Sequence, residues 1–177
     1  MGFCLFNNIA VGALRARAAH NLDRIAVIDF DVHHGNGTQA AFEADGGLFY
    51  ASTHQSPLYP GTGSASETGV GNIVNVPLRP MAGSREFRAA MSGHILPALD
   101  AFRPELVLIS AGFDAHRSDP LAQLQLDEED YAWVTERLIE IADRHAGGRL
   151  VSALEGGYDL PALGASVAAH VSVLMSV

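Results

Sequence analysis

Two aspartates and a histidine alternate at the end of an apolar segment, in the order Asp29, Asp31 and His33. In an extended chain alternate side chains lie on one face, so this spacing directs two carboxylates and an imidazole to the same side. Such groups bind zinc at about 2.0–2.2 Å. The same spacing would also occur without a metal, if the aspartates capped a neighbouring helix and the histidine were a buried structural residue. The polar residues and glycines that follow favour the metal site.

Two further apolar segments, 105–110 and 150–154, also end in polar residues and glycines. Asp114 follows the first segment, and Tyr158 follows the second after two glycines. Because the carboxyl ends of parallel strands meet at one edge of a sheet, we expect these residues to lie near the first cluster. Asp114 would complete an Asp-His-Asp metal set with an open position, and Tyr158 would donate to an oxyanion during hydrolysis of a carbonyl compound. Taken singly, Asp114 as a turn cap and Tyr158 as a half-buried aromatic are equally good interpretations.

Apolar segments rich in β-branched residues alternate with segments of helical spacing. This alternation predicts an α/β fold with a doubly wound parallel sheet. A stretch at 55–72 rich in Pro, Gly, Ser and Thr is predicted to be a functional loop. We predict strands at 25–30, 48–52, 73–77, 105–110 and 150–154, and helices at 8–20, 38–44, 84–102, 127–145 and from Pro161 onward.

Composition bounds the class of protein. The chain has 177 residues, of which 48% are hydrophobic and 18% charged, as expected for a single globular domain over 1–177. The formal net charge of -9 argues against a nucleic-acid partner. One cysteine, Cys4, excludes an internal disulfide and fits a reducing cytoplasm. We find no signal peptide and no membrane span in the sequence, so we expect a cytoplasmic protein with no membrane partner.

Five sequence blocks, in order along nearly the whole chain, match one known family. Together they resemble the zinc-dependent histone deacetylase and acetylpolyamine amidohydrolase family, which has the arginase-deacetylase fold. Asn36 and the last two blocks are similar to its class II and bacterial branch. The blocks are GFCLFNN at 2–8, DFDVHHGNGT at 29–38, YPGTG at 59–63, GFDAH at 112–116 and LEGGY at 154–158.

The resemblance implies a catalytic metal and a reaction. Asp31, His33 and Asp114 would be the ligands of zinc, with iron(II) as the alternative ion, and Tyr158 would be the oxyanion donor. The reaction would be deacetylation of an acetyl-lysine or an acetylpolyamine by metal-activated water. Branches of the family that carry histidine at the position of Tyr158 are poor deacetylases, so this chain has the active residue there.

The resemblance also implies structural cations and a substrate channel. A potassium ion would be held by Asp29 and Ser52 with the main-chain carbonyls of Asp31, His33 and Thr53. A second cation would use carbonyls near Phe42, Asp45, Leu48 and Ile73. The narrow channel for the acyl-lysine would be lined by Gly2, Phe3, Tyr59 and Gly156.

The family places two adjacent histidines shortly before the first block, as general base and electrostatic partner. Because the sequence begins at Met1, we expect the amino-terminal part of the domain, with both histidines, to be absent from this chain. Loss of a general base costs about 10²–10⁴-fold in rate, so we expect the isolated chain to be greatly impaired.

Two rival functions remain open. An arginase-like ureohydrolase shares the fold but needs two adjacent metals and more carboxylates than surround Asp31 and Asp114 here. The chain could instead be a non-catalytic metal-binding fragment or acetyl-amine binder. Apolar surface left exposed would then favour self-association, so a homo-oligomer is expected.

Overall fold

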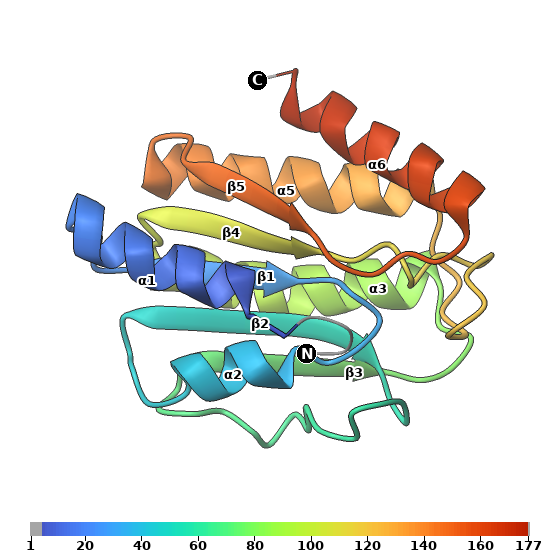
Figure 1. The fold of residues 1–177 in the computed structure, drawn as a ribbon, viewed down its shortest axis with the longest axis horizontal. Helices are drawn as coiled ribbons and strands as arrows, with labels where there is room; N and C mark the ends of the chain where they lie inside the picture. The colour runs from blue at the N-terminus through green and yellow to red at the C-terminus, as the bar shows by residue number, and fades with distance from the viewer. Residues whose placement is uncertain (1–4, 177) are drawn as a thin grey trace.

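A computed structural model describes residues 5–176 (Figure 1). Five parallel strands form one sheet within these residues, in the order β3-β2-β1-β4-β5. The parallel sheet predicted from the sequence is therefore confirmed. The strands are β1 (Ile25–Asp29), β2 (Leu48–Gln55), β3 (Ile73–Leu78), β4 (Leu106–Ala111) and β5 (Leu150–Leu154).

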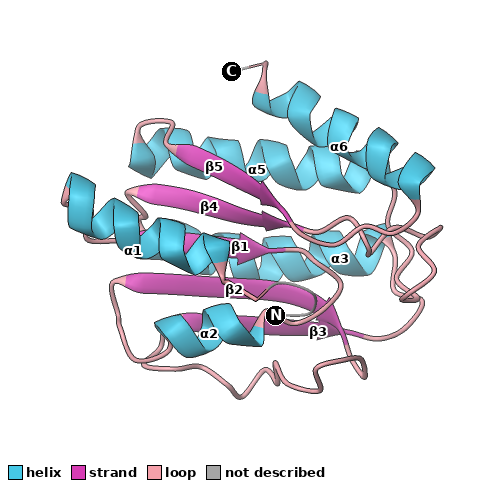
Figure 2. Ribbon diagram, in the orientation of Figure 1, coloured by secondary structure: helices cyan, strands magenta, loops and turns pink. Residues whose placement is uncertain are grey.

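Helices cover both faces of the sheet (Figures 1 and 2). On one face Ile25 and Val27 of β1 pack in a core with α1 and with Phe42 of α2. On the other face Ala26 and Ile28 belong to a core with α3, α4 and α5. This arrangement is the predicted double winding. The helices are α1 (Asn8–His20), α2 (Asn36–Phe42), α3 (Ser84–Ala90), the π-helical turn η1 (Met91–Ile95), α4 (Leu96–Phe102), α5 (Glu128–Ala146) and α6 (Leu160–Leu174), which packs against α5.

The register of the central strands brings their carboxyl ends level. Asp29 at the end of β1 lies opposite Ser52 of β2 on one side and Ser110 of β4 on the other. Leu154 at the end of β5 lies opposite Ala111. The loops that follow β1, β4 and β5 therefore start at one edge of the sheet, as the sequence predicts.

The predicted helix over 84–102 is interrupted by η1. Phe87, Met91, Ile95 and Leu99 form the predicted apolar stripe, and all four are buried. On a regular helix, residues four apart advance by about 40° around the axis at each step. A wider π turn holds more residues per turn and so reduces this drift, which keeps the stripe on the sheet.

Strand β2 extends three residues beyond the prediction, through Thr53 and His54 to Gln55. These polar residues looked like the start of a loop, but all three are buried and pair with β3. Distant segments supply polar partners for two of them, because Gln55 Oε1 accepts the Gln123 N–H at 2.8 Å and His54 contacts the loop over 55–72. His54 Nε2 lies 3.0 Å from the carbonyl oxygen of Gly63. Helix α2 also begins two residues earlier than predicted, at Asn36.

Strand β5 has a neighbour on one side only within the described residues. Val151 and Leu154 are 55% and 63% exposed, and Val11 and Leu14 of α1 are also exposed. Apolar surface of this kind accords with the expected self-association, which stays a prediction. Among the helices of residues 5–176, none combines the length and apolar character needed to cross a bilayer.

A buried histidine links α6 to α5 and β5. His170 Nδ1 lies 2.6 Å from Thr135 Oγ1, and His170 Nε2 lies 2.9 Å from Ser152 Oγ. Because the Thr135 hydroxyl donates to the carbonyl of Tyr131, it accepts the hydrogen bond from Nδ1–H. Burial lowers the pKa of His170 to about 4, so the neutral ring is the folded form.

We predict that His170 makes the folded chain acid-sensitive. The unfolded chain binds this proton near pH 6.5 and the folded chain only near pH 4, so the free energy of unfolding falls as the pH drops through that window. The loss from this one group is at most about 3 kcal/mol. Urea unfolding at several pH values should therefore show a shallower pH dependence in His170→Gln than in wild type. The same substitution at the exposed His94 is the control, and an unchanged slope in His170→Gln contradicts the prediction.

Candidate metal centre

Three potential metal ligands converge at the carboxyl edge of the sheet. Asp31, His33 and Asp114 each offer a ligand atom, and these atoms lie within 4.8 Å of one another. His33 Nδ1 is 3.1 Å from Asp31 Oδ1 and 3.1 Å from Asp114 Oδ2. Two carboxylates and one imidazole, with Asp114 only 1% exposed, fit a divalent cation such as zinc or iron(II). The structure thus assembles the predicted Asp-His-Asp set.

Backbone N–H groups of the loop after β1 hold both aspartates of the cluster. Asp31 Oδ1 accepts the His33 N–H at 2.8 Å, and Asp114 Oδ1 accepts the Val32 N–H at 2.8 Å. The strand itself ends at Asp29, so the extended geometry assumed from the sequence stops before the cluster. Asp29 is not one of the three converging residues. Its Oδ2 accepts a hydrogen bond from the Tyr50 hydroxyl at 2.9 Å.

The electrostatics of the cluster favour a bound positive charge. Hydrogen bonds to Asp114 and Asp31 raise the pKa of His33 to about 10, against the opposing effect of burial. Burial and the charge of Asp31 raise the pKa of Asp114 to about 6. Two carboxylates so close together need a cation between them, either the imidazolium proton or a metal ion. A metal ion must displace that proton, so metal affinity should fall as the pH falls.

Two glycines let the backbone approach these carboxylates. A Cβ atom at Gly112 would collide with Asp31, and one at Gly156 would collide with both Asp31 and Asp114. The Gly156 N–H donates to Asp31 Oδ2 at 2.9 Å, and the Gly156 carbonyl accepts from Phe113 N–H at 2.7 Å. The turn after β5 is therefore bonded directly to Asp31, one of the three potential ligands.

The same turn carries Tyr158, whose side chain is partly exposed. Its backbone N–H donates to Asp119 Oδ2 at 2.8 Å. The structure brings the turn of Tyr158 next to the cluster, as the strand-end argument predicted. The sequence reasoning gave Asp119 no role, although an aspartate before a proline is a common turn signal.

The residues implied for the potassium site are buried beside the cluster. Asp29 and Ser52 lie opposite each other in the sheet, and Thr53 is also buried. Ser52 Oγ is 2.9 Å from His54 Nδ1. Burial, then the charge of Asp31, raises the pKa of Asp29 well above its usual value, so this carboxylate would also be stabilised by a cation.

The carbonyls implied for a second cation converge on a side-chain amide of the protein. Asn72 Nδ2 donates to the carbonyl oxygens of Phe42 at 2.8 Å, Asp45 at 3.0 Å and Leu48 at 2.5 Å. An amide group has two hydrogens and so cannot fully satisfy three acceptors. Three of the four main-chain carbonyls that the resemblance implies for the second cation therefore lie around one position, that of Asn72 Nδ2.

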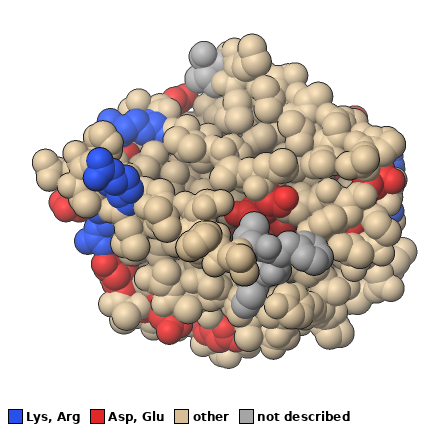
Figure 3. Space-filling model, viewed as in Figure 1, with Lys and Arg blue, Asp and Glu red and all other residues tan. Residues whose placement is uncertain are grey.

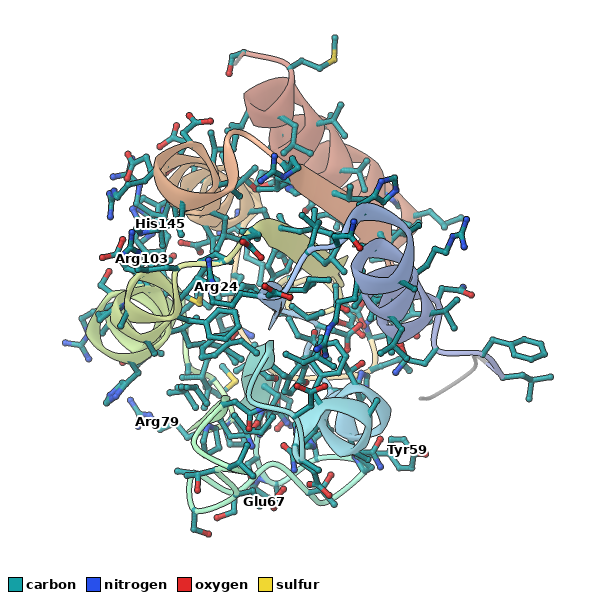
Figure 4. The ribbon with its side chains drawn as sticks, turned by 90° about the vertical axis from the view of Figure 1, so that its left-hand side faces the viewer. Arg24, Tyr59, Glu67, Arg79, Arg103 and His145 are labelled. Atoms are coloured by element: carbon teal, nitrogen blue, oxygen red, sulfur yellow. The ribbon has the colours of Figure 1, made fainter. Side chains whose placement is uncertain are left out.

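Of the residues predicted to line a substrate channel, Gly2 and Phe3 lie outside the described residues. Gly156 is buried beside the metal ligands. Tyr59 is 59% exposed, and its ring centroid lies 6.5 Å from that of His33, at an interplanar angle of 68°. Tyr59 and Glu67 come from the same loop beside α2 (Figure 4).

A polar network that the sequence reasoning missed fixes this loop. Glu67 accepts hydrogen bonds from the backbone N–H groups of Gly63 and Ser64 and from Gln39 Nε2. His34 lies 2.8 Å from both Thr62 Oγ1 and Gln39 Oε1. These contacts tie the loop of Tyr59 to α2. The His34–Thr62 and Gln39–Glu67 contacts each join residues 28 positions apart, and composition alone gave no signal for them.

The surface around the site is not strongly basic. The chain contains arginine but no lysine. On the face shown in Figure 3, arginines gather at the end of the molecule where α1 lies, and acidic groups lie beside them, along the lower edge and at the centre. The formal net charge of the whole sequence is -9. An acidic protein of this kind attracts cationic ligands in preference to polyanions.

Comparisons with known proteins point to one family. The family model described as "Histone deacetylase domain" matches residues 1–174. The histone deacetylase-like amidohydrolase of Pseudomonas aeruginosa is 43% identical over 99% of this chain and 48% of its own length. Histone deacetylase 10, chloroplastic, of Oryza sativa subsp. japonica is 48% identical over 95% of this chain and 39% of its own length.

Solved structures agree with these sequence relatives. The crystal structure of the HDA15 HD domain superposes with a TM-score of 0.93 at 42% identity, covering 99% of this chain and 51% of that one. The structure of the histone deacetylase Clr3 gives a TM-score of 0.91 at 34% identity, covering 98% of this chain and 30% of that one. The chain therefore spans about half the length, or less, of these proteins.

The glycine at the cluster provides a test of the site. We predict that Gly156→Ala abolishes stoichiometric binding of a divalent metal, because its Cβ would displace the carboxylates of Asp31 and Asp114. Gly164→Ala on α6 is the matched control, because its Cβ meets nothing within 4 Å. Metal titration by calorimetry measures the binding, and circular dichroism checks the fold. Equal metal affinity in Gly156→Ala and Gly164→Ala would show that the site lies elsewhere.

Proposed function

The chain belongs to the histone deacetylase domain family, and on this premise we propose that it carries the metal site of a zinc-dependent deacetylase acting on acetylated amines. The observation that carries the proposal is the convergence of Asp31, His33 and Asp114 at one sheet edge. The glycine turn that bears Tyr158 is bonded to the carboxylate of Asp31. Relatives named as deacetylases and amidohydrolases support the same class of hydrolytic reaction.

Each residue of the site would have a distinct role. Zinc, when bound, would polarise the acetyl carbonyl and acidify a water molecule. Asp31, His33 and Asp114 would hold the ion, with His33 giving up its proton to make room for it. The Tyr158 hydroxyl would donate a hydrogen bond to the oxygen that gains negative charge as water attacks. The exposed ring of Tyr59 beside His33 would flank the linear part of the substrate.

The proposed substrate is an acetylated primary amine on a flexible chain, either an acetyl-lysine or an acetylpolyamine. The remaining amino groups of a polyamine are cationic, and the net charge of the protein is -9. Attraction between the two would favour encounter.

Zinc is proposed over iron(II), and potassium is proposed at Asp29 and Ser52. We also propose a cytoplasmic location, on the ground that the sequence contains a single cysteine.

Two imidazoles near the cluster, those of His34 and His54, have other partners. His34 contacts Thr62 and Gln39, and His54 contacts Ser52 and the Gly63 carbonyl. Within residues 5–176, therefore, we assign no histidine as general base. We propose that the 177 residues alone hydrolyse the substrate slowly.

Two other functions make different predictions about the same site. An arginase-like ureohydrolase would bind two adjacent metal ions, whereas one group of three ligands converges here within the described residues. A non-catalytic acetyl-amine binder would hold one metal ion without turnover. Metal stoichiometry and turnover together separate the three functions.

We predict one zinc ion per wild-type chain and measurable hydrolysis of a fluorogenic acetyl-lysine amide. Asp114→Ala should lose both the zinc and the hydrolysis, because it removes a ligand. Tyr158→Phe should keep the zinc and lose about 10²–10³-fold in kcat, as expected for an oxyanion donor. Elemental analysis and initial rates measure these outcomes, and Asp143→Ala on the exposed face of α5 is the control.

Two results would count against the deacetylase. Two metal ions per chain would favour the ureohydrolase, and zinc without turnover above background would favour the binder. Equal rates in Tyr158→Phe and wild type would remove Tyr158 from the mechanism.

A further inference from the structure

We propose that Asp119 is a positioning residue for Tyr158, holding its backbone so that the phenol stands at the metal site. The inference rests on the proposed function for its catalytic consequence, but its geometric part concerns the protein alone. Asp119 lies 39 residues before Tyr158 in the sequence. It is 7% exposed, and its carboxylate accepts two backbone hydrogen bonds.

The carboxylate of Asp119 is itself held in place. Oδ1 accepts the Leu121 N–H at 3.0 Å and Oδ2 accepts the Tyr158 N–H at 2.8 Å. The Asp119 N–H donates to the carbonyl of His116 at 2.9 Å. Pro120 follows, and a residue before proline has a restricted backbone. Asp119 is therefore a rigid acceptor and not a mobile surface acid.

Tyr158 lies in a turn that needs such an acceptor. Gly157 has a φ of +143°, which few other residues adopt, and glycine leaves the backbone free to take other conformations. Before the turn, Gly156 is fixed by Asp31 and Phe113. After it, Asp159 caps α6 by accepting the Ala162 N–H at 2.9 Å. The N–H of Tyr158 between these two anchors is held by Asp119.

Tyr158 is 38% exposed, so solvent covers part of its side chain. The hydrogen bond to Asp119 is the contact that fixes its backbone N–H. A shift of about 1 Å in a catalytic group can cost about 10²-fold in rate. Loss of the bond should therefore lower the rate of the chemical step while leaving substrate binding nearly unchanged.

Asp119 also links Tyr158 to the metal ligands. It lies on the same loop as Asp114, and this loop is closed by hydrogen bonds of Leu126 N–H to Ala115 and of Arg117 N–H to Leu126. The loop after β4 therefore supplies both a metal ligand and the acceptor that holds the oxyanion donor. One segment, the loop after β4, thus helps to place both the metal, through Asp114, and the phenol, through Asp119.

The kinetic test combines Asp119→Ala with Tyr158→Phe. We expect Asp119→Ala to lower kcat on the acetyl-lysine amide by about 10- to 100-fold, with KM within about threefold of wild type and zinc content unchanged. If Asp119 acts through the phenol, the double variant should be no slower than Tyr158→Phe alone. Independent losses that multiply in the double variant, or an unchanged kcat in Asp119→Ala, would overturn the proposal.

A second test does not depend on turnover. The chain has 4 tyrosines, so 3-fluorotyrosine labelling should give four ¹⁹F resonances, assigned by substitution of each tyrosine by phenylalanine. Asp119→Ala should shift or broaden the Tyr158 resonance and leave those of Tyr50, Tyr59 and Tyr131 in place. Asp119→Asn, which keeps one acceptor oxygen, should give a smaller change. Asp127→Asn is the control in the same loop, because asparagine also caps a helix.

The outcomes separate this inference from the proposed function. An unmoved Tyr158 resonance, or equal changes in all four resonances, overturns the positioning role. A shift confined to Tyr158 in a protein without deacetylase turnover supports the positioning role and counts against the deacetylase.

Discussion

The placement of two carboxylates around one imidazole nitrogen governs the design of this molecule. Asp31 and Asp114 each lie 3.1 Å from His33 Nδ1, at an edge of the sheet where Asp114 has almost no contact with water. Buried like charges repel, so the arrangement is stable only with a positive charge between them. In the protein alone that charge is the proton of His33. A divalent cation meets the same need with stronger electrostatic attraction.

The rest of the fold supplies the conditions for this cluster. The register that sets Asp29 level with Ser52 and Ser110 starts the loops after β1 and β4 side by side. Apolar strands below the cluster keep its dielectric constant low, which strengthens every charge interaction in it. Glycines at 112 and 156 remove the side chains that would separate the loops from the carboxylates. The strand register, the apolar strands and the two glycines thus all help to hold Asp31, His33 and Asp114 together.

Much of this could be predicted from the sequence, because strand and helix patterns are local. The α/β order, the parallel sheet and the convergence of Asp31, His33 and Asp114 all follow from apolar segments that end in polar residues. What could not be predicted depends on distant partners. Thr53, His54 and Gln55 are polar yet remain in β2, because their backbones pair with β3 and the side chains of His54 and Gln55 bond to Gly63 and Gln123. The roles of Glu67 and Asp119 likewise depend on hydrogen bonds between residues that are far apart in the sequence.

The carboxylates of the site share one structural device. Asp31 Oδ2 accepts the Gly156 N–H and Asp114 Oδ1 accepts the Val32 N–H, so each ligand has one oxygen engaged with the backbone of another loop. Asp119 does the same for Tyr158. A carboxylate can accept from several donors at once, whereas an amide or hydroxyl would place its own hydrogen against a backbone N–H at some of these contacts. Aspartate at these three positions therefore joins the three strand-end loops into one unit, and the geometry of the turn that bears Tyr158 depends on the same loops as that of the Asp-His-Asp cluster.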